Sequence, residues 1–394
     1  MITLLVISIM IIGYAYLGYP LLLLALNKMS RKNIEEVTLS PSELPEITVV
    51  VPAYNEEQYL DEKIKNTLKL DYPKSKLKVI VITDGSDDGS TKLLKDRKDI
   101  LHLHEPERGG KLSAMKRAIS YVKSPITVFT DANALVNKEA LLIIANKFMN
   151  TDVGVVAGEK RIKTGRNLNG STSGESTYWK YESWMKKLNS EFNSTIGAVG
   201  ELFAIRTELF EVKTKAYILD DFMLSLNANI KGYKTIYAPD AYALELASSD
   251  LKEEYKRKVR IAAGGWQSIL DLFSRKEMFK QPKLIFQLLS RRVIRWMLSP
   301  ILLPVIFLLN ILLVNTHWTL DILLVCQIAF YTFSMVGFWL SRNEDMHPLF
   351  KIPFYFTFMH LAAFAGMIRY FSGKQSVLWD KVNRINPEVA LTMD

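Results

Sequence analysis

The chain has 394 residues, a formal net charge of +9 and a hydrophobic content of 49%. This length allows two domains, and this hydrophobic content suits either a large soluble protein or a membrane protein. The apolar residues are concentrated in four long segments at the two ends of the chain, which favours a membrane protein and argues against nucleic acid as the partner of the positive charge. The single cysteine, Cys326, excludes an intrachain disulfide and a cysteine-based zinc cluster.

The first apolar segment covers residues 1–26 and carries no charge beyond the amino terminus. A membrane-spanning helix needs roughly 20 such residues. The run is longer than the apolar core of a cleaved signal peptide, and no basic region precedes it. We therefore expect residues 1–28 to form an N-terminal transmembrane anchor.

The other apolar segments are residues 297–314, 319–340 and about 350–371. They predict about three further membrane segments within residues 297–371. An amphipathic interface segment is expected before them, at residues 276–296, and a tail after them, at residues 372–394.

The middle of the chain, residues 30–296, is polar and basic, and residues 29–275 are expected to form one domain. Basic segments between membrane helices stay in the cytoplasm, so the sequence predicts a multi-pass protein of the inner (plasma) membrane with a cytoplasmic middle domain. Alternate crossings then place the C-terminal tail outside. The basic residues Lys374, Lys381 and Arg384 leave a second topology open, in which residues 350–371 are re-entrant or interfacial and the tail stays inside.

Strand and helix patterns alternate through this middle domain. The run EITVVVPA is followed by a helical pattern with Leu60, Ile64 and Leu68, and then by the strand pattern LKVIVI. A second helical pattern, KLSAMKRAISYV, precedes the strand PITVFT and the helix KEALLIIANKFM. This order predicts an α/β fold, with a mostly parallel sheet covered by helices on both faces.

Polar clusters follow three of the predicted strands. They consist of Asn55 with Glu56, the run TDGSDDGS that contains Asp84, and Asp131 with Asn133. The carboxyl ends of parallel strands meet at one edge of a sheet, so these clusters predict a common nucleotide-type site.

These clusters fit neither a calcium-binding loop nor the two common nucleotide-binding motifs. A calcium-binding loop starting at Asp84 would need Glu at its twelfth position, which is Lys95, and a helix before it. The segment PAYNEE lacks the glycines of a dinucleotide-binding turn, and Gly109–Lys111 is followed by Leu112 where a P-loop needs Ser or Thr. What remains is a site of acidic loops and a metal ion.

Seven motifs in order resemble the membrane-bound family 2 glycosyltransferases, the group that includes cellulose, chitin and hyaluronan synthases. The motifs are VVVPAYNEE, VITDGSDDGS, RGGKLSAMKRAI, FTDAN, VGELFAIR, LDDFMLSLNANIKGYKTIYAPDA and RKVRIAAGGW. The resemblance covers most of the chain. It implies a GT-A fold, which is a nucleotide-sugar-binding α/β domain, between N-terminal and C-terminal transmembrane helices.

The resemblance also implies roles for the acidic loops. Asp84 would contact the uracil or ribose of a UDP-sugar, near Asn55 and Glu56, and Lys111 would contact the phosphate or the base. Asp131 and Asn133 would bring Mg²⁺ or Mn²⁺ to the diphosphate, which suits hard oxygen ligands. Asn133 departs from the second Asp of the family pattern, so the site has one negative charge less.

Asp221 aligns with the general base of the family. An inverting transfer needs a carboxylate that takes the proton from the acceptor hydroxyl. Asp220 stands where the family usually has Glu, which leaves open which aspartate is the base. A helix N-cap is the alternative role for Asp221, and both roles are compatible.

The motif RKVRIAAGGW lies where processive synthases carry Gln-x-x-Arg-Trp. Arg260 matches the arginine that would hold the diphosphate, whereas Arg257 replaces the Gln and Ile261 replaces the Trp that stacks on the acceptor sugar. Trp266 is a candidate substitute for that Trp. An amphipathic interface helix is compatible with this assignment. A second basic group, Arg291, Arg292 and Arg295, is expected to contact lipid headgroups.

The resemblance thus implies a metal-dependent inverting hexosyltransferase that moves a sugar from a UDP-sugar to a growing polysaccharide or a lipid-linked acceptor. A non-processive single-sugar transferase is the alternative that Ile261 favours. A catalytically silent scaffold of a polysaccharide export complex is a third hypothesis. The expected partners are the donor, the acceptor and the bilayer, with export-complex subunits or a second copy of the chain as further candidates, and no nucleic acid.

Overall fold

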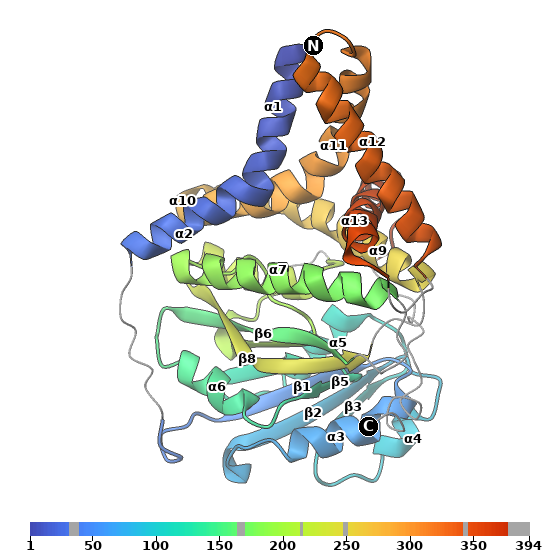
Figure 1. The fold of residues 1–394 in the computed structure, drawn as a ribbon. Coiled ribbons are helices and arrows are strands. Elements are labelled where there is room, and N and C mark those ends of the chain that lie inside the picture. The colour runs from blue at the N-terminus through green and yellow to red at the C-terminus, as the bar shows by residue number, and fades with distance from the viewer. Residues whose placement is uncertain (31–38, 164–169, 213–215, 247–250, 342–345, 377–394) are drawn as a thin grey trace.

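The molecule has an α/β domain beneath a group of apolar helices (Figure 1). The computed structural model describes residues 1–30, 39–163, 170–212, 216–246, 251–341 and 346–376. The side chains of residue 163 and of residues 170–177 lie outside this description, as does most of the expected tail, residues 377–394.

One eight-stranded sheet forms the centre of the α/β domain. In spatial order its strands are β3 (Leu101–Glu105), β2 (Leu77–Asp84), β1 (Ile47–Ala53), β4 (Ile126–Thr130), β7 (Leu202–Arg206), β6 (Val153–Lys163), β8 (Lys234–Leu246) and β5 (Ala134–Val136). Strands β3, β2, β1 and β4 are parallel, β7 runs antiparallel to β4 and β6, and β6 is parallel to β8. The expected mostly parallel sheet of a GT-A-like domain is thus confirmed.

Both faces of the sheet are apolar, which explains the continuous hydrophobic runs in the sequence. On one face, Val49 and Val51 of β1 pack with the side chains of α3 (Glu57–Leu68) and α6 (Ala140–Lys147). On the other face, Val50 packs with α5 (Lys111–Ile119) and α8 (Asp220–Ile230). Helices thus cover both faces of these strands. The polar clusters lie in the loops at the strand ends, at the edge of the sheet.

The other elements range from single turns of helix to two helices of 23 residues. They are η2 (Lys74–Lys76), α4 (Ser90–Leu94), α7 (Gly170–Phe192), η3 (Thr207–Leu209), α9 (Leu251–Phe273), η4 (Lys276–Lys280) and α10 (Pro282–Leu288). Helix α7 lies between the sheet and the apolar helices (Figure 1).

Four helical segments within the described residues are long and apolar enough to cross a membrane. The first consists of α1 (Ile2–Gly13), the π-helix η1 (Tyr14–Gly18) and α2 (Tyr19–Met29). The others are α10 continuing through the π-helix η5 (Leu289–Leu298) into α11 (Ser299–Leu312), then α12 (Trp318–Trp339), and then α13 (Pro348–Phe371). The chain therefore has the helices of a multi-pass membrane protein.

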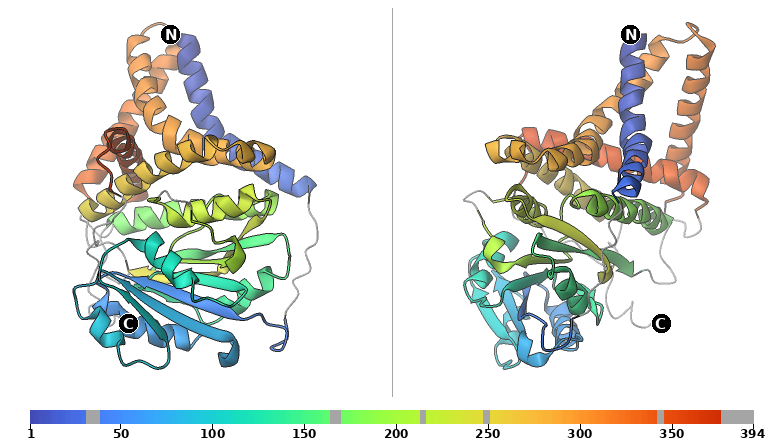
Figure 2. Two further views of the ribbon diagram at one scale, coloured as in Figure 1. Left: turned by 180° about the vertical axis from the view of Figure 1, so that it is seen from behind. Right: turned by 90° about the vertical axis from the view of Figure 1, so that its left-hand side faces the viewer.

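Helix α13 differs from the other apolar helices in its direction. Helices α1, α11 and α12 rise away from the α/β domain, whereas α13 runs across them and beside α9 (Figure 2). Phe358 of α13 contacts Tyr255 near the start of α9, with ring centroids 5.7 Å apart, and Phe371 contacts Trp266 near its end, at 5.1 Å. Both halves of α13 thus pack along α9.

A buried charge cluster joins α7 to η5. Glu182 of α7 accepts a hydrogen bond from Arg291 at 2.9 Å through one carboxylate oxygen. Its other oxygen forms an ion pair with Arg295 at 2.8 Å, and Arg292 lies 4.0 Å away. The side chains of Arg291 and Arg295 are 0% and 8% exposed. The expectation of lipid-headgroup contacts is wrong for these two residues, because an internal carboxylate takes their charge.

Candidate active site

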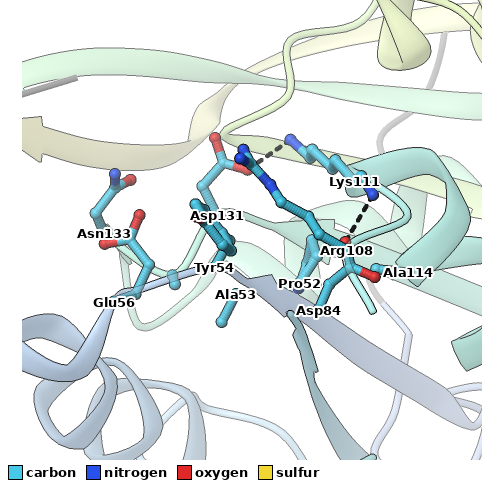
Figure 3. Close-up of a pocket in the computed structure, with 12 residues that line it drawn as sticks. Pro52, Ala53, Tyr54, Glu56, Asp84, Arg108, Lys111, Ala114, Asp131 and Asn133 are labelled. Carbon is cyan, nitrogen blue, oxygen red and sulfur yellow. Dashed lines mark hydrogen bonds and ion pairs between the residues drawn. The ribbon is translucent and has the colours of Figure 1, made fainter. Parts of the chain in front are cut away.

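A pocket opens where β1, β2 and β4 end (Figure 3). It is lined by Pro52, Ala53, Tyr54, Glu56, Asp84, Arg108, Gly110, Lys111, Ala114, Asp131, Ala132 and Asn133. The pocket thus brings together residues from all three polar clusters that the sequence singled out.

Asp84 is the last residue of β2, and its side chain is buried. One carboxylate oxygen accepts the backbone N–H of Gly110 at 2.6 Å, and the other pairs with the guanidinium of Arg117 on α5. The next residue, Gly85, has a φ of +67°, and a Cβ there would lie 2.6 Å from the Cβ of Arg108. The turn after β2 therefore requires glycine, and it holds the loop of Arg108 and Gly110 against the strand end.

Asn55 and Glu56 follow β1 but face different neighbours. Asn55 adopts a left-handed φ of 55°, and its side-chain amide exchanges two hydrogen bonds with Asp87, at 2.6 Å and 3.0 Å. Glu56 is buried and lines the pocket. Asn55 thus ties two loops together, and a direct substrate contact of Asn55 remains a prediction.

Lys111, the first residue of α5, forms the central ion pair of the pocket. Its ammonium lies 2.5 Å from Oδ1 of Asp131, and the two side chains are 17% and 22% exposed (Figure 3). Burial alone would lower the pKa of Lys111, but the charges of Asp131, Asp220 and Asp221 raise it above its usual range. Lys111 is therefore a permanent cation that a set of carboxylates shares.

Asp220 and Asp221 form the first turn of α8. Oδ1 of Asp220 accepts the N–H of Asp221 at 2.9 Å, and Oδ1 of Asp221 accepts the N–H of Phe222 at 2.7 Å, so both carboxylates are fixed by the helix start. A Cβ at Gly200 would lie 3.0 Å from the Lys111 ammonium and 3.4 Å from Oδ2 of Asp221. Asp221 thus adjoins the pocket beside Lys111.

The pKa of Asp221 is well suited to proton transfer. Burial, followed by the negative charge of Asp220, raises the pKa of Asp221 to about 7. A general base works best when its pKa lies near the operating pH. The arrangement can therefore accept a proton next to the nucleotide-type pocket.

Asp131 and Asn133 fit the divalent metal that the resemblance implies. Both line the pocket and offer carboxylate and amide oxygens, which Mg²⁺ and Mn²⁺ prefer, and Asp131 already holds a cation in the form of the Lys111 ammonium. No group of three or more potential ligands among His, Cys, Asp and Glu occurs in the described part of the chain.

The residues predicted on α9 lie outside the lining of the pocket. Arg257 pairs with Glu254 at 2.9 Å, and Arg260 donates a long hydrogen bond of 3.5 Å to the carbonyl of Ile218, near the Asp220–Asp221 turn. Trp266 packs edge-on against Phe371 of α13. Substrate contacts of these three α9 residues remain predictions.

The structure adds two groups that the sequence reasoning missed. The guanidinium of Arg108 stacks on the ring of Tyr54 at 3.6 Å, and both residues line the pocket. Arg117 neutralises Asp84. The motifs that carry the resemblance contain all three residues, but only the fold shows that their side chains meet.

Comparison with known proteins agrees with this geometry. Residues 45–264 match the family model described as glycosyltransferase like family 2. Poly-beta-1,6-N-acetyl-D-glucosamine synthase of Staphylococcus aureus (strain COL) is 26% identical over 261 residues, which cover 64% of this chain and 60% of that protein. The probable glycosyltransferase YdaM of Bacillus subtilis (strain 168) is 24% identical over 387 residues, or 90% of both chains.

A solved structure shares the fold. The mannosyltransferase PcManGT from Pyrobaculum calidifontis, in complex with GDP-Man and Mn²⁺, superposes with a TM-score of 0.72 and 22% sequence identity, covering 94% of this chain and 100% of that one. The family model spans more than half of the chain and includes every pocket residue. The chain therefore belongs to the family 2 glycosyltransferases, with apolar helices on both sides of its catalytic domain.

Proposed function

We propose that the protein is a membrane-integrated, inverting, metal-dependent hexosyltransferase. It transfers a sugar from a UDP-sugar to a growing polysaccharide or a lipid-linked acceptor. The observation that carries this proposal is the carboxylate of Asp221, which has a raised pKa and adjoins a pocket with the Asp131–Lys111 pair.

Each group has a place in this reaction. Asp84 and its loop bind the nucleoside, and Asp131 with Asn133 would hold a divalent cation, which supplies charge stabilisation to the departing diphosphate when bound. Asp221 takes the proton from the acceptor hydroxyl as that oxygen attacks the anomeric carbon and the bond to the nucleoside diphosphate breaks. Attack opposite to the leaving group inverts the anomeric configuration.

The test is release of nucleoside diphosphate by the detergent-purified protein. The panel contains UDP-glucose, UDP-N-acetylglucosamine and UDP-galactose, together with GDP-mannose, each with Mn²⁺, Mg²⁺ or chelator. We expect metal-dependent release with one UDP-sugar, loss of release in Asp131→Ala, and full release in Asp240→Asn, an exposed aspartate outside the pocket. Release from GDP-mannose alone would contradict the assignment of the donor.

Polymer synthesis is supported by the name of the staphylococcal relatives, whereas Ile261 in place of the acceptor-stacking Trp favours addition of a single sugar. Sizing the product separates the two, because a ladder of lengths requires a processive enzyme. A silent scaffold predicts no metal-dependent nucleotide binding at all.

We further infer that the α/β domain and the end of α13 lie on the cytoplasmic side. The packing of α13 along α9 supports a shared side for the two, and the basic bias of the middle of the chain supports the cytoplasmic side. In a Cys326→Ser background, cysteines at Ser40 and Ser372 should react with an impermeant maleimide only after cells are opened. A cysteine at Asn315, in the turn between α11 and α12, should react in intact cells, and reaction of Ser372→Cys in intact cells would refute the orientation.

A further inference from the structure

The candidate metal ligand Asp131 already has a cation bound to it. Lys111 lies 2.5 Å from Oδ1 of Asp131, and its ammonium is also attracted by Asp220 and Asp221. The negative charge of Glu201 also acts on Asp131, but Glu201 pairs with the buried Lys160 at 2.6 Å. Lys111 is thus the cation that three carboxylates at the edge of the pocket have in common.

We propose that Lys111 and the divalent metal compete for Asp131, so that the metal binds tightly only together with the nucleoside diphosphate. This inference rests on the proposed function. It assigns to Lys111 the control of the order in which metal and donor bind. Lys111 is a positioning residue in this role, because it acts on the metal through Asp131.

Competition follows from distance and charge. An ammonium at 2.5 Å from Oδ1 occupies the space that a metal ligated by the same oxygen would need. A divalent ion and an ammonium this close repel each other, and the repulsion is strong in a partly buried site. The metal can therefore reach Asp131 only when Lys111 withdraws.

The side chain of Lys111 can move, but its ammonium gains a new anionic partner only when the donor is present. Its backbone is fixed at the start of α5, but its long side chain lines the pocket and retains 17% exposure. A diphosphate in the pocket offers anionic oxygens to the ammonium and frees Asp131 for the metal. Without the diphosphate, an ammonium that left Asp131 would have only a weaker partner, so Lys111 stays paired with Asp131.

The coupling is reciprocal. If the diphosphate strengthens metal binding by a given factor, the metal strengthens diphosphate binding by the same factor. Removing the positive charge of Lys111 should strengthen metal binding to the protein alone and reduce this factor. Keeping the charge in Lys111→Arg should preserve the coupling.

The experiment measures Mn²⁺ affinity by electron paramagnetic resonance of the free ion, using the full-length protein in detergent with and without UDP. The variants are Lys111→Met, Lys111→Arg, Asp131→Ala and Lys116→Met, where Lys116 is an exposed lysine on the same helix. Thermal unfolding of each variant checks that it is folded.

We expect UDP to tighten Mn²⁺ binding to the wild type at least about tenfold, which is within the range of typical coupling between sites. Lys111→Met should bind Mn²⁺ without UDP about tenfold more tightly than the wild type, with a smaller further gain from UDP. Lys111→Arg and Lys116→Met should behave like the wild type, and Asp131→Ala should lose the Mn²⁺ binding that UDP strengthens.

Two negative results have different meanings. If UDP and Mn²⁺ bind cooperatively but Lys111→Met has the wild-type Mn²⁺ affinity without UDP, the competition is refuted while the proposed function stands. If the wild type shows no Mn²⁺-dependent UDP binding, the proposed function itself fails.

Discussion

Two charge clusters in this molecule have opposite compositions. At the pocket, one lysine, Lys111, serves Asp131, Asp220 and Asp221, whereas between α7 and η5 one glutamate, Glu182, serves Arg291, Arg292 and Arg295. The side chains of the central pair at the pocket are 17% and 22% exposed, while Glu182 is 5% exposed. The central pair of the first cluster lines the pocket, whereas the second cluster is buried between α7 and η5.

This difference indicates what each cluster can do. Groups at the pocket can exchange one partner for a ligand, because solvent and substrate reach them. The groups around Glu182 are sealed by packing, so their partners are permanent. We therefore expect substitutions in the first cluster to change activity and substitutions in the second to change stability.

The largest effect is expected for the proposed base. Asp221→Asn should lower kcat/KM by about 10²- to 10⁴-fold, because general-base catalysis contributes factors of this size. The thermal midpoint should not fall, since the substitution removes a charge that burial and Asp220 already disfavour. Donor turnover and thermal unfolding measure the two quantities.

Asp220→Asn is the matched control for that prediction. Asp220 accepts the N–H of Asp221 and contributes to its raised pKa, so its loss should cost less activity than the loss of Asp221. An equal or greater loss in Asp220→Asn would transfer the role of base to Asp220.

The second effect concerns the sealed cluster. Glu182→Gln removes the carboxylate that serves the three arginines, and breaking a buried ion pair costs about 3–5 kcal/mol. The thermal midpoint in detergent should therefore fall strongly. Glu191→Gln, at an exposed position on the same helix, should change it little. A Glu182→Gln protein as stable as the wild type would contradict the assignment of a stabilising role to the cluster around Glu182.

The third effect is a pH dependence of activity, which arises from the cluster at the pocket. The active form of Asp221 is the ionised one, and its pKa is raised to about 7, so the active fraction is lost as the pH falls through that value. The logarithm of kcat/KM should rise with a slope of about one below pH 7 and level off above it. In Asp220→Asn this limb should move to lower pH, and an unmoved limb would show that Asp220 does not set the pKa.

The smallest effect is expected for a charge pair in open solvent. Lys78 lies 3.4 Å from Glu46, and both side chains are more than half exposed. Exposed pairs contribute little, so Lys78→Gln should change the free energy of unfolding by less than about 0.5 kcal/mol and leave activity unchanged. A larger change would show that the exposure of a charge pair does not predict how much it contributes to the stability of this protein.

Much of the fold was predictable because it follows local patterns. The spacing of Leu60, Ile64 and Leu68 predicted α3, and the apolar runs predicted the parallel strands β1, β2 and β4. The convergence of Glu56, Asp84, Asp131 and Asn133 on one pocket followed from the rule that parallel strands end at one edge. The antiparallel β7 was not predictable in this way, because strand direction depends on how the chain returns to the sheet.

The side-chain partners were not predictable. No spacing in the sequence shows that Arg291 and Arg295 are buried on Glu182, which lies more than one hundred residues earlier. Likewise, the sequence offered Trp266 as a candidate substitute for the acceptor-stacking Trp, but it could not show that the ring packs on Phe371. Such contacts depend on how separate helices dock, and sequence periodicity carries no information about that docking.

The sequence by itself thus determined the α/β class, the apolar ends of the chain and the acidic loops, because each depends on local periodicity or on motifs within one segment. Only the tertiary structure decided which charges share a partner. It paired Lys111 with Asp131, placed Asp221 beside them, and laid α13 along α9. These arrangements arise from packing between distant segments. Distance and burial determine whether a charged group can exchange its partner for a ligand or keeps that partner and contributes to stability.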